Sequence, residues 1–120
     1  MLKPIFECSG RFQWWSYTVS HGQLLLRSTK SRQRDTQVDV LFKDVVFVSI
    51  PTSLENIEIL EADDADRPTG LELEKDRKIF VVRGTDFSGF VAAAVVLHAE
   101  GTGALNDPSP LVPQFPPDEA

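Results

Sequence analysis

The residues that could ligate a metal ion are few and widely spaced. The chain has one cysteine, Cys8, and two histidines, His21 and His98. Metal sites in proteins bring several imidazole, thiolate or carboxylate ligands together. His21 is better explained as a turn residue, and His98 as a residue near the end of the last regular element. We therefore expect no metal site and no cofactor.

An acidic stretch has the carboxylate density of a calcium loop but not its pattern. The stretch is EADDADRPTGLE, residues 61–72. Pro68 interrupts it, and the glycine required at the sixth position of such a loop is absent. We interpret this stretch as a solvated acidic loop.

Nucleophilic catalysis has no support in the sequence. Ser20 and His21 are neighbours in a predicted turn, where side chains diverge, and there is no GxSxG, P-loop or GxGxxG motif. Cys8 follows Glu7 and has no adjacent cation to favour a thiolate. Carboxylate pairs such as Asp63-Asp64 or Glu72 and Glu74 stand in or beside predicted loops, whereas paired catalytic carboxylates must be held across a cleft. We expect that the protein is not an enzyme.

The first regular element is a predicted β-hairpin. Residues 11–28, RFQWWSYTVSHGQLLLRS, alternate around a two-residue turn at His21-Gly22. This turn would place Val19 opposite Leu24. One face of both strands is then apolar and is expected to form core: Trp15, Tyr17, Val19, Leu24 and Leu26.

Further strands follow in the same alternating pattern. Residues 28–36 are polar and basic and indicate a loop, whereas residues 37–51 predict either a second hairpin or one strand bent at a bulge. Residues 55–62 predict a strand. Residues 70–84 predict a short strand, a charged turn and a second strand whose inward residues are Phe80 and Val82.

The stretch SGFVAAAVVLHAEG, residues 88–101, is compatible with two structures. Its alanines and capping residues suit a helix, whereas its valines and the preceding turn suit a strand. We favour the strand. A helix over residues 89–99 would instead suggest an open barrel closed by a C-terminal helix, as in pleckstrin-homology-like domains, which is an analogy of fold alone.

The chain of 120 residues fits one domain followed by a tail. Residues 1–103 are expected to form a single all-β, mostly antiparallel domain, either a β-sandwich or a small barrel of seven to eight strands. Residues 104–120 hold five of the eight prolines and predict an extended proline-rich tail.

Composition limits which cellular compartment and which classes of partner we expect for the protein. The net charge of −6 disfavours binding to nucleic acid or to anionic membranes. One cysteine makes no internal disulfide, the first residues have no apolar run of signal-peptide length, and the run at residues 90–97 is too short to span a bilayer. We expect a cytoplasmic protein.

Charge is distributed unevenly along the chain. Residues 27–34 hold four basic side chains and no acid, whereas residues 55–76 hold nine acids against two bases. The basic stretch could hold a phosphate or an acidic peptide. The acidic stretch suits a basic protein partner. Its candidate contact residues are Glu58, Glu61, Asp63, Asp64 and Asp66.

The adjacent tryptophans raise a question about the outer face of the hairpin. Neighbouring residues of a strand point to opposite faces, so if Trp15 is core, Trp14 points outward. Three explanations are possible. The proline-rich tail could cover that outer face, or a partner or second copy of the chain could cover it. Alternatively, a bulge could turn both rings inward. The outward residues proposed as partner contacts are Phe12, Trp14, Leu25 and Arg27.

These observations predict a small non-enzymatic protein-binding module. Small size, acidity and the absence of catalytic motifs also suit an immunity or antitoxin-type protein that neutralises a basic toxin. A barrel holding a small apolar or anionic ligand is the alternative, and an enzyme using scattered carboxylates is the third. A ligand-sized internal cavity would favour the barrel, and a filled core with an exposed apolar patch would favour the partner.

Overall fold

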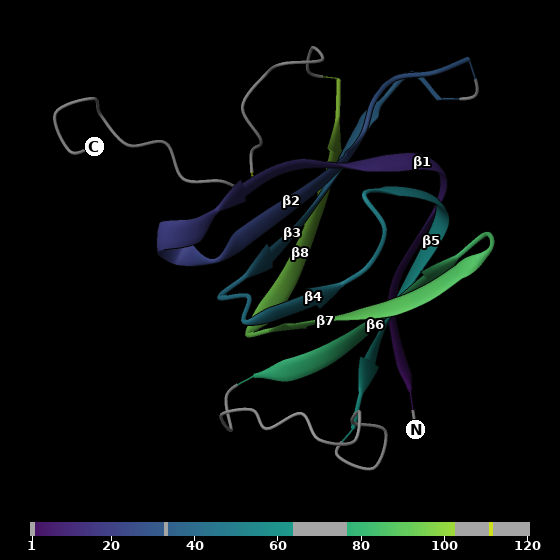
Figure 1. Cartoon of the computed structure of the whole chain (residues 1–120). Helices are drawn as coiled ribbons and strands as arrows, with labels where there is room; N and C mark the ends of the chain where they lie inside the picture. Colours follow the sequence, from purple (N-terminus) through teal and green to yellow (C-terminus); the bar gives the residue numbers. More distant parts are fainter. Residues whose placement is uncertain (1, 33, 64–76, 103–110, 112–120) are drawn as a thin grey trace, which may run out of the picture.

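The protein is an eight-stranded antiparallel β structure, as the alternation predicts (Figure 1). The computed structural model describes residues 2–32, 34–63, 77–102 and 111, and these contain no α-helix. One continuous sheet has the order β4-β7-β6-β5-β1-β2-β3-β8. The strands are β1 Lys3–Thr18, β2 Gln23–Ser28, β3 Gln37–Lys43, β4 Phe47–Ser49, β5 Ser53–Ala62, β6 Lys78–Gly84, β7 Phe87–Ala93 and β8 Val95–Gly101.

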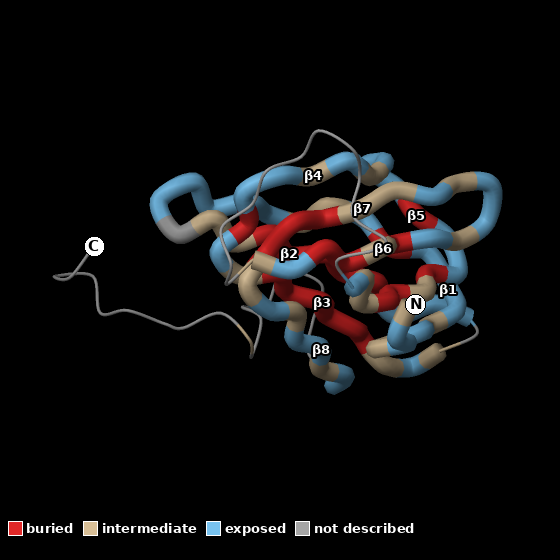
Figure 2. The backbone as a smooth tube through the Cα atoms, turned by 90° about the horizontal axis from the view of Figure 1, so that it is seen from below, coloured by how far each residue is buried: buried red, intermediate tan, exposed pale blue. Residues whose placement is uncertain are grey.

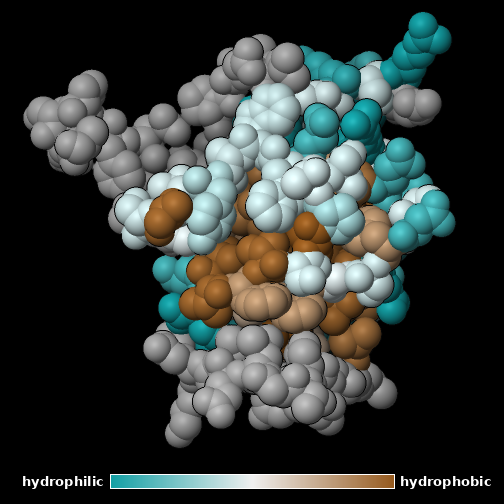
Figure 3. Space-filling view, viewed as in Figure 1, coloured by the Kyte–Doolittle hydropathy of each residue, from teal (hydrophilic) through white to brown (hydrophobic). Residues whose placement is uncertain are grey.

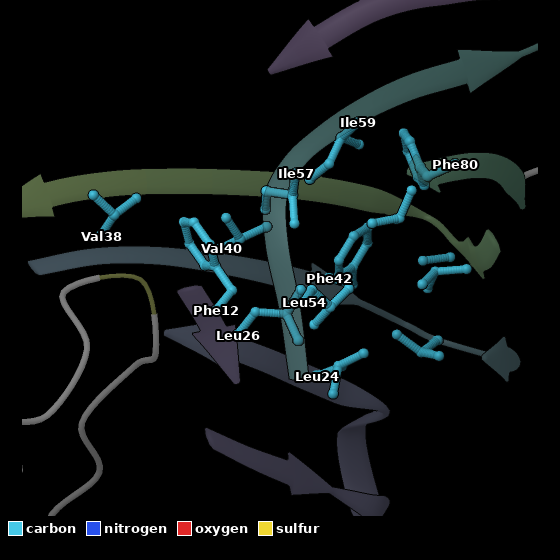
Figure 4. Packing of buried hydrophobic residues seen from close by; sticks show 14 residues of the cluster. Phe12, Leu24, Leu26, Val38, Val40, Phe42, Leu54, Ile57, Ile59 and Phe80 are labelled. Atoms are coloured by element: carbon cyan, nitrogen blue, oxygen red, sulfur yellow. The ribbon is translucent and has the colours of Figure 1, made fainter. Parts of the chain in front are cut away.

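The sheet curls so that its two halves face each other. Strands β2, β3 and β8 make one wall, and β4, β7 and β6 make the other (Figures 1 and 2). Phe42 of β3 and Phe80 of β6 are four strands apart in the sheet order, yet their ring centroids are 6.0 Å apart. The side chains between the walls fill the interior, and Figure 4 shows them converging from β1, β2, β3, β5 and β6.

The predicted hairpin of residues 11–28 is confirmed, but its register is wrong by two residues. Strands β1 and β2 are joined by a 3₁₀ turn at Val19–His21 (η1) rather than by a two-residue turn. Gly22 follows with φ +55°, a left-handed conformation in which a Cβ would lie 2.9 Å from the carbonyl oxygen of Val45. Tyr17 therefore pairs with Leu24. Val19, expected in the core, lies in the turn and is 82% exposed.

Residues 37–51 form neither of the two predicted arrangements. Strands β3 and β4 do not pair with each other: β3 lies between β2 and β8, whereas β4 pairs with β7 at the other end of the sheet. The chain turns between them at Asp44, which has φ +54°. The pattern break was visible in the sequence, but the distant pairing partners were not.

The remaining expectations are largely confirmed. Strand β5 covers residues 55–62, and Phe80 and Val82 of β6 point into the core. Residues 88–101 are strand, divided into β7 and β8 at Ala94. The short strand predicted at the start of residues 70–84 and the tail of residues 104–120 lie outside the described residues, apart from Leu111.

Candidate functional site

The two residues expected at the centre of an outward surface, Phe12 and Trp14, point into the protein instead. Strand β1 has a bulge between Trp14 and Ser16, so that Trp14 pairs with Leu26, a core residue. The extra residue reverses the faces of the residues just before it, Phe12 and Trp14 included. Phe12 is fully buried and Trp14 packs against the core, so the prediction of an outward face formed by these rings is wrong.

Trp15 takes the opposite face from the one predicted. Its ring lies over the guanidinium of Arg27, with 5.1 Å between the guanidinium carbon and the ring centroid. The bulge was one of the considered readings of the tryptophan pair. It does not turn both rings inward, however, because it turns Trp14 inward and Trp15 outward, over Arg27.

Leu25 and Arg27 do lie on the outer face of β2, but neither is accessible. They are 4% and 1% exposed. Arg27 makes an ion pair with Asp39 of β3, with 2.8 Å between Nε and Oδ1 and 3.0 Å between Nη2 and Oδ2. Arg27 belongs to the basic stretch of residues 27–34, but its ion pair with Asp39 gives its guanidinium a structural role.

A second arginine of the basic stretch, Arg34, holds the loop between β2 and β3 against β1. Its Nη1 donates to the carbonyl oxygen of Ser9 at 2.7 Å and to Sγ of Cys8 at 3.2 Å, and its Nη2 donates to Oγ of Ser28. Burial raises the pKa of the Cys8 thiol, and the charge of Arg34 offsets part of that rise. The net effect is a thiol pKa above its ordinary value.

A polar cleft of about 490 Å³ opens beside Arg34, and Arg11 also lines it. Here β1 is bulged opposite Asn56, whose Oδ1 accepts a hydrogen bond from the Gly10 amide at 3.0 Å. Arg11 donates from Nε to Oγ of Ser53 at 3.0 Å. The two guanidinium groups supply hydrogen-bond donors to an anion, and Glu55 is also in the lining.

The acidic candidates fall into two groups. Glu58 and Glu61 lie on β5 and contact cations of β6: Glu58 is 2.7 Å from Nε of Arg83, and Glu61 is 3.4 Å from Nζ of Lys78. Asp63 is exposed just beyond β5. Asp64 and Asp66 lie outside the described residues. The structure therefore places the first residues of the acidic stretch on and just beyond β5. For Asp64 and Asp66, contact with a basic partner stays a prediction.

An exposed apolar patch lies where the sequence indicated none. Four residues from two segments, 46–47 and 90–95, form what we call the apolar corner: Val46, Phe47, Phe90 and Val95. Val46, Phe47 and Val95 are 53%, 43% and 39% exposed. In Figure 3 an apolar surface extends over β4 and β7.

Backbone hydrogen bonds hold the apolar corner together. The amide of Val46 donates to the carbonyl oxygen of Ala92 at 2.9 Å, and the amide of Ala94 donates to that of Lys43 at 3.0 Å. The rings of Phe47 and Phe90 stack with centroids 5.2 Å apart and planes 9° from parallel. The usable signal was the run VVFV at residues 45–48, which has no polar residue for an outward position.

The described residues contain neither a cluster of metal ligands nor a helix able to cross a membrane. No three or more histidine, cysteine or acidic side chains in this part of the chain are grouped so as to hold a metal ion. His98 is instead stacked on Phe6, with ring centroids 4.4 Å apart. Within the described ranges, no helix has the length and apolar character needed to cross a membrane.

The comparisons with known proteins give no relative on which to model this site. No family model matches the chain, and neither a curated protein nor a solved structure matches it.

Proposed function

We propose that this protein is a non-enzymatic binding module whose partner is a basic protein that docks on the apolar corner. The observation that carries the proposal is the exposure of Val46, Phe47 and Val95 on two hydrogen-bonded segments, with Phe47 stacked on Phe90. Contiguous apolar surface on a folded domain is typical of interaction sites, and aromatic residues are enriched at their centres. The packed interior shown in Figure 4 also favours a surface function over ligand storage.

The charge of the segment between β5 and β6 supports a basic partner. Strand β7 pairs with β6, so that Ala93 of the corner segment lies opposite Lys78, and Ile79 lies opposite Ala62 at the end of β5. Residues 63–76 join these strand ends and make up the second part of the acidic stretch. They contain six acids and two bases. A partner with an apolar centre and a basic rim would match both features, and the acidic stretch would accelerate its approach. Neutralisation of a basic toxin is one role compatible with such a surface.

The test compares two exposed apolar residues at different places. The full chain, its Phe47→Ser variant and its Val19→Ser variant are each used to capture partners from the native extract by crosslinking. Val19 is the matched control because it is apolar, 82% exposed and outside the corner. We expect a basic protein to be crosslinked at the corner by the parent chain and by Val19→Ser but not by Phe47→Ser. Its association rate should fall as salt rises.

Several outcomes would contradict the proposal. Equal capture by Phe47→Ser and the parent chain would remove the corner from the interface. An acidic partner, or one whose association rate is indifferent to salt, would remove the electrostatic part. Concentration-dependent self-association that Phe47→Ser abolishes would assign the corner to a second copy of the chain.

The polar cleft between Arg11 and Arg34 supports a second candidate, binding of a small anion. Its guanidinium groups are the donors that carboxylate and phosphate oxygens prefer. Titration of the full chain with inorganic phosphate, followed by amide resonances of Ser9, Gly10 and Asn56, tests it. Saturable shifts that Arg11→Gln abolishes are expected, and unchanged resonances would exclude this ligand.

A further inference from the structure

The outer face of β2 and β3 is buried although it points away from the core. Alternate residues of a strand face opposite sides of the sheet, and the core takes Val38, Val40 and Phe42 of β3. The residues between them should face solvent. Instead, five outward side chains, between the partly buried Gln23 and Lys43 of these strands, are 0–7% exposed: Leu25, Arg27, Gln37, Asp39 and Leu41.

The described strands do not form a second layer over this face. The eight strands make one sheet, and each wall encloses the interior with its inner side. Trp15 lies over Arg27 from the neighbouring strand β1, but Leu41 is on β3, the next strand beyond β2. A covering segment is needed, since Leu41 has no exposed surface at all.

We propose that the proline-rich tail, residues 104–120, docks in an extended conformation across the outer face of β2 and β3. The tail begins at the right place. Gly101 at the end of β8 pairs with Gln37 at the start of β3, and the next residue, Thr102, accepts a hydrogen bond from Nζ of Lys30 at 2.8 Å. The chain is thus fixed beside this face at the point where the tail starts.

The tail also has the length that this face requires. The seven residues of β3 span roughly 23 Å at the rise of an extended strand. Seventeen residues in a polyproline conformation reach roughly 50 Å, about twice that distance. Prolines lower the entropy lost on docking because their φ is already fixed. Leu111, the described residue of the tail, is partly buried.

The chemistry of the face fits an extended proline-rich segment. Extended segments of this kind bind grooves lined by aromatic side chains, and Trp15 supplies such a ring. Leu25 and Leu41 offer apolar contacts to the tail residues Leu105, Leu111, Val112 and Phe115. Gln37, which is 7% exposed, has a buried Oε1 without a hydrogen-bond donor, and a backbone amide of the tail would satisfy it.

This inference concerns a different face from the apolar corner and is independent of the proposed function. It predicts that the tail belongs to the folded domain rather than following it as a linker. A dilute solution of the full chain, isotopically labelled, should show nuclear Overhauser contacts from tail methyl groups to Trp15 and Leu41. In mixtures of labelled and unlabelled chains, these contacts should remain within one molecule.

A pair of variants of the full chain tests whether the docking is specific. Leu111→Asp places a charge against the apolar face and should remove the contacts and speed amide exchange at Leu25 and Leu41. Ser109→Asp introduces the same charge two residues away and should change neither. Absence of the contacts in the parent chain, contacts only between molecules, or equal effects of the two variants would each overturn the proposal.

Discussion

The guanidinium of Arg27 and the carboxylate of Asp39 form two nearly parallel hydrogen bonds, of 2.8 and 3.0 Å, in a site with almost no exposure. Removal of the carboxylate breaks both hydrogen bonds to a buried guanidinium, which costs more than the pair contributes. Asp39→Ala should therefore lower the free energy of unfolding by about 3–5 kcal/mol in urea titrations. The double replacement Arg27→Met with Asp39→Leu should cost much less.

A surface pair provides the control for that prediction. Arg83 and Glu58 are as close, at 2.7 Å, but are 46% and 34% exposed. Arg83→Ala should cost less than about 1 kcal/mol because solvent screens such pairs. Equal losses from Asp39→Ala and Arg83→Ala would mean that the Arg27 site is hydrated in solution.

The tryptophans should respond differently to truncation. Trp14 packs against the core, so Trp14→Ala should lower the free energy of unfolding by about 3 kcal/mol or more. Trp14→Phe should cost little, because Nε1 of Trp14 is buried without an acceptor and its loss removes an unsatisfied donor. Chemical denaturation followed by circular dichroism measures both. A large loss from Trp14→Phe would show that Nε1 has an acceptor in solution.

Trp15→Ala should be milder than Trp14→Ala. It removes the contact with Arg27, which contributes about 0.5–2 kcal/mol when the cation is desolvated. Comparison of the two alanine variants by their loss in free energy of unfolding therefore shows which tryptophan the bulge places in the core. A more severe effect of Trp15→Ala would place Trp15, not Trp14, in the core.

Gly89 on β7 should not accept a side chain. A Cβ at this position would lie 1.9 Å from the carbonyl oxygen of Ser49 on β4, so the edge strand would have to move. Gly89→Ala should lower the free energy of unfolding by about 1–3 kcal/mol and perturb resonances of Phe47. Gly101→Ala is the control because its Cβ meets no atom within 4 Å. Similar stability of the two variants would contradict the close approach of β4.

Stability at alkaline pH should depend on Cys8. Burial raises the pKa of its thiol in the folded protein, so the unfolded chain loses that proton first as the pH rises. This contribution is fully present below the thiol's ordinary pKa and is lost as the pH rises through the folded value. The melting temperature of the parent chain should fall more between pH 8 and pH 10 than that of Cys8→Ser. Parallel profiles would show that the thiol is not desolvated.

The sequence predicted the strands well because side-chain alternation is a local property. The strands around Leu24 and Leu26, Ile57 and Ile59, and Phe80 and Val82 all follow from it. Faces were harder to predict, because the one-residue bulge at Trp15 reverses Phe12 and Trp14, and no residue type in this stretch marks it. The apolar corner depends on which strands meet. Val46 reaches Ala92 through a pairing between segments 46 residues apart, and alternation contains no information about such partners.

The junction at Ala94 has a consequence for how the chain folds. The successive pairings β1–β2–β3 and β5–β6–β7 join strands that follow one another in the chain, so each closes less chain than the pairing of β1 with β5 or of β3 with β8. By contrast, β8 pairs with β3 across roughly sixty residues of chain, although it begins immediately after β7, the hairpin partner of β6. Loop closure over such distances must precede the contacts that compensate for it, and folding slows as contacts become less local. Two separate meanders should therefore form first, and their union through the non-local β1–β5 and β3–β8 pairings should limit the rate, on the order of milliseconds to seconds.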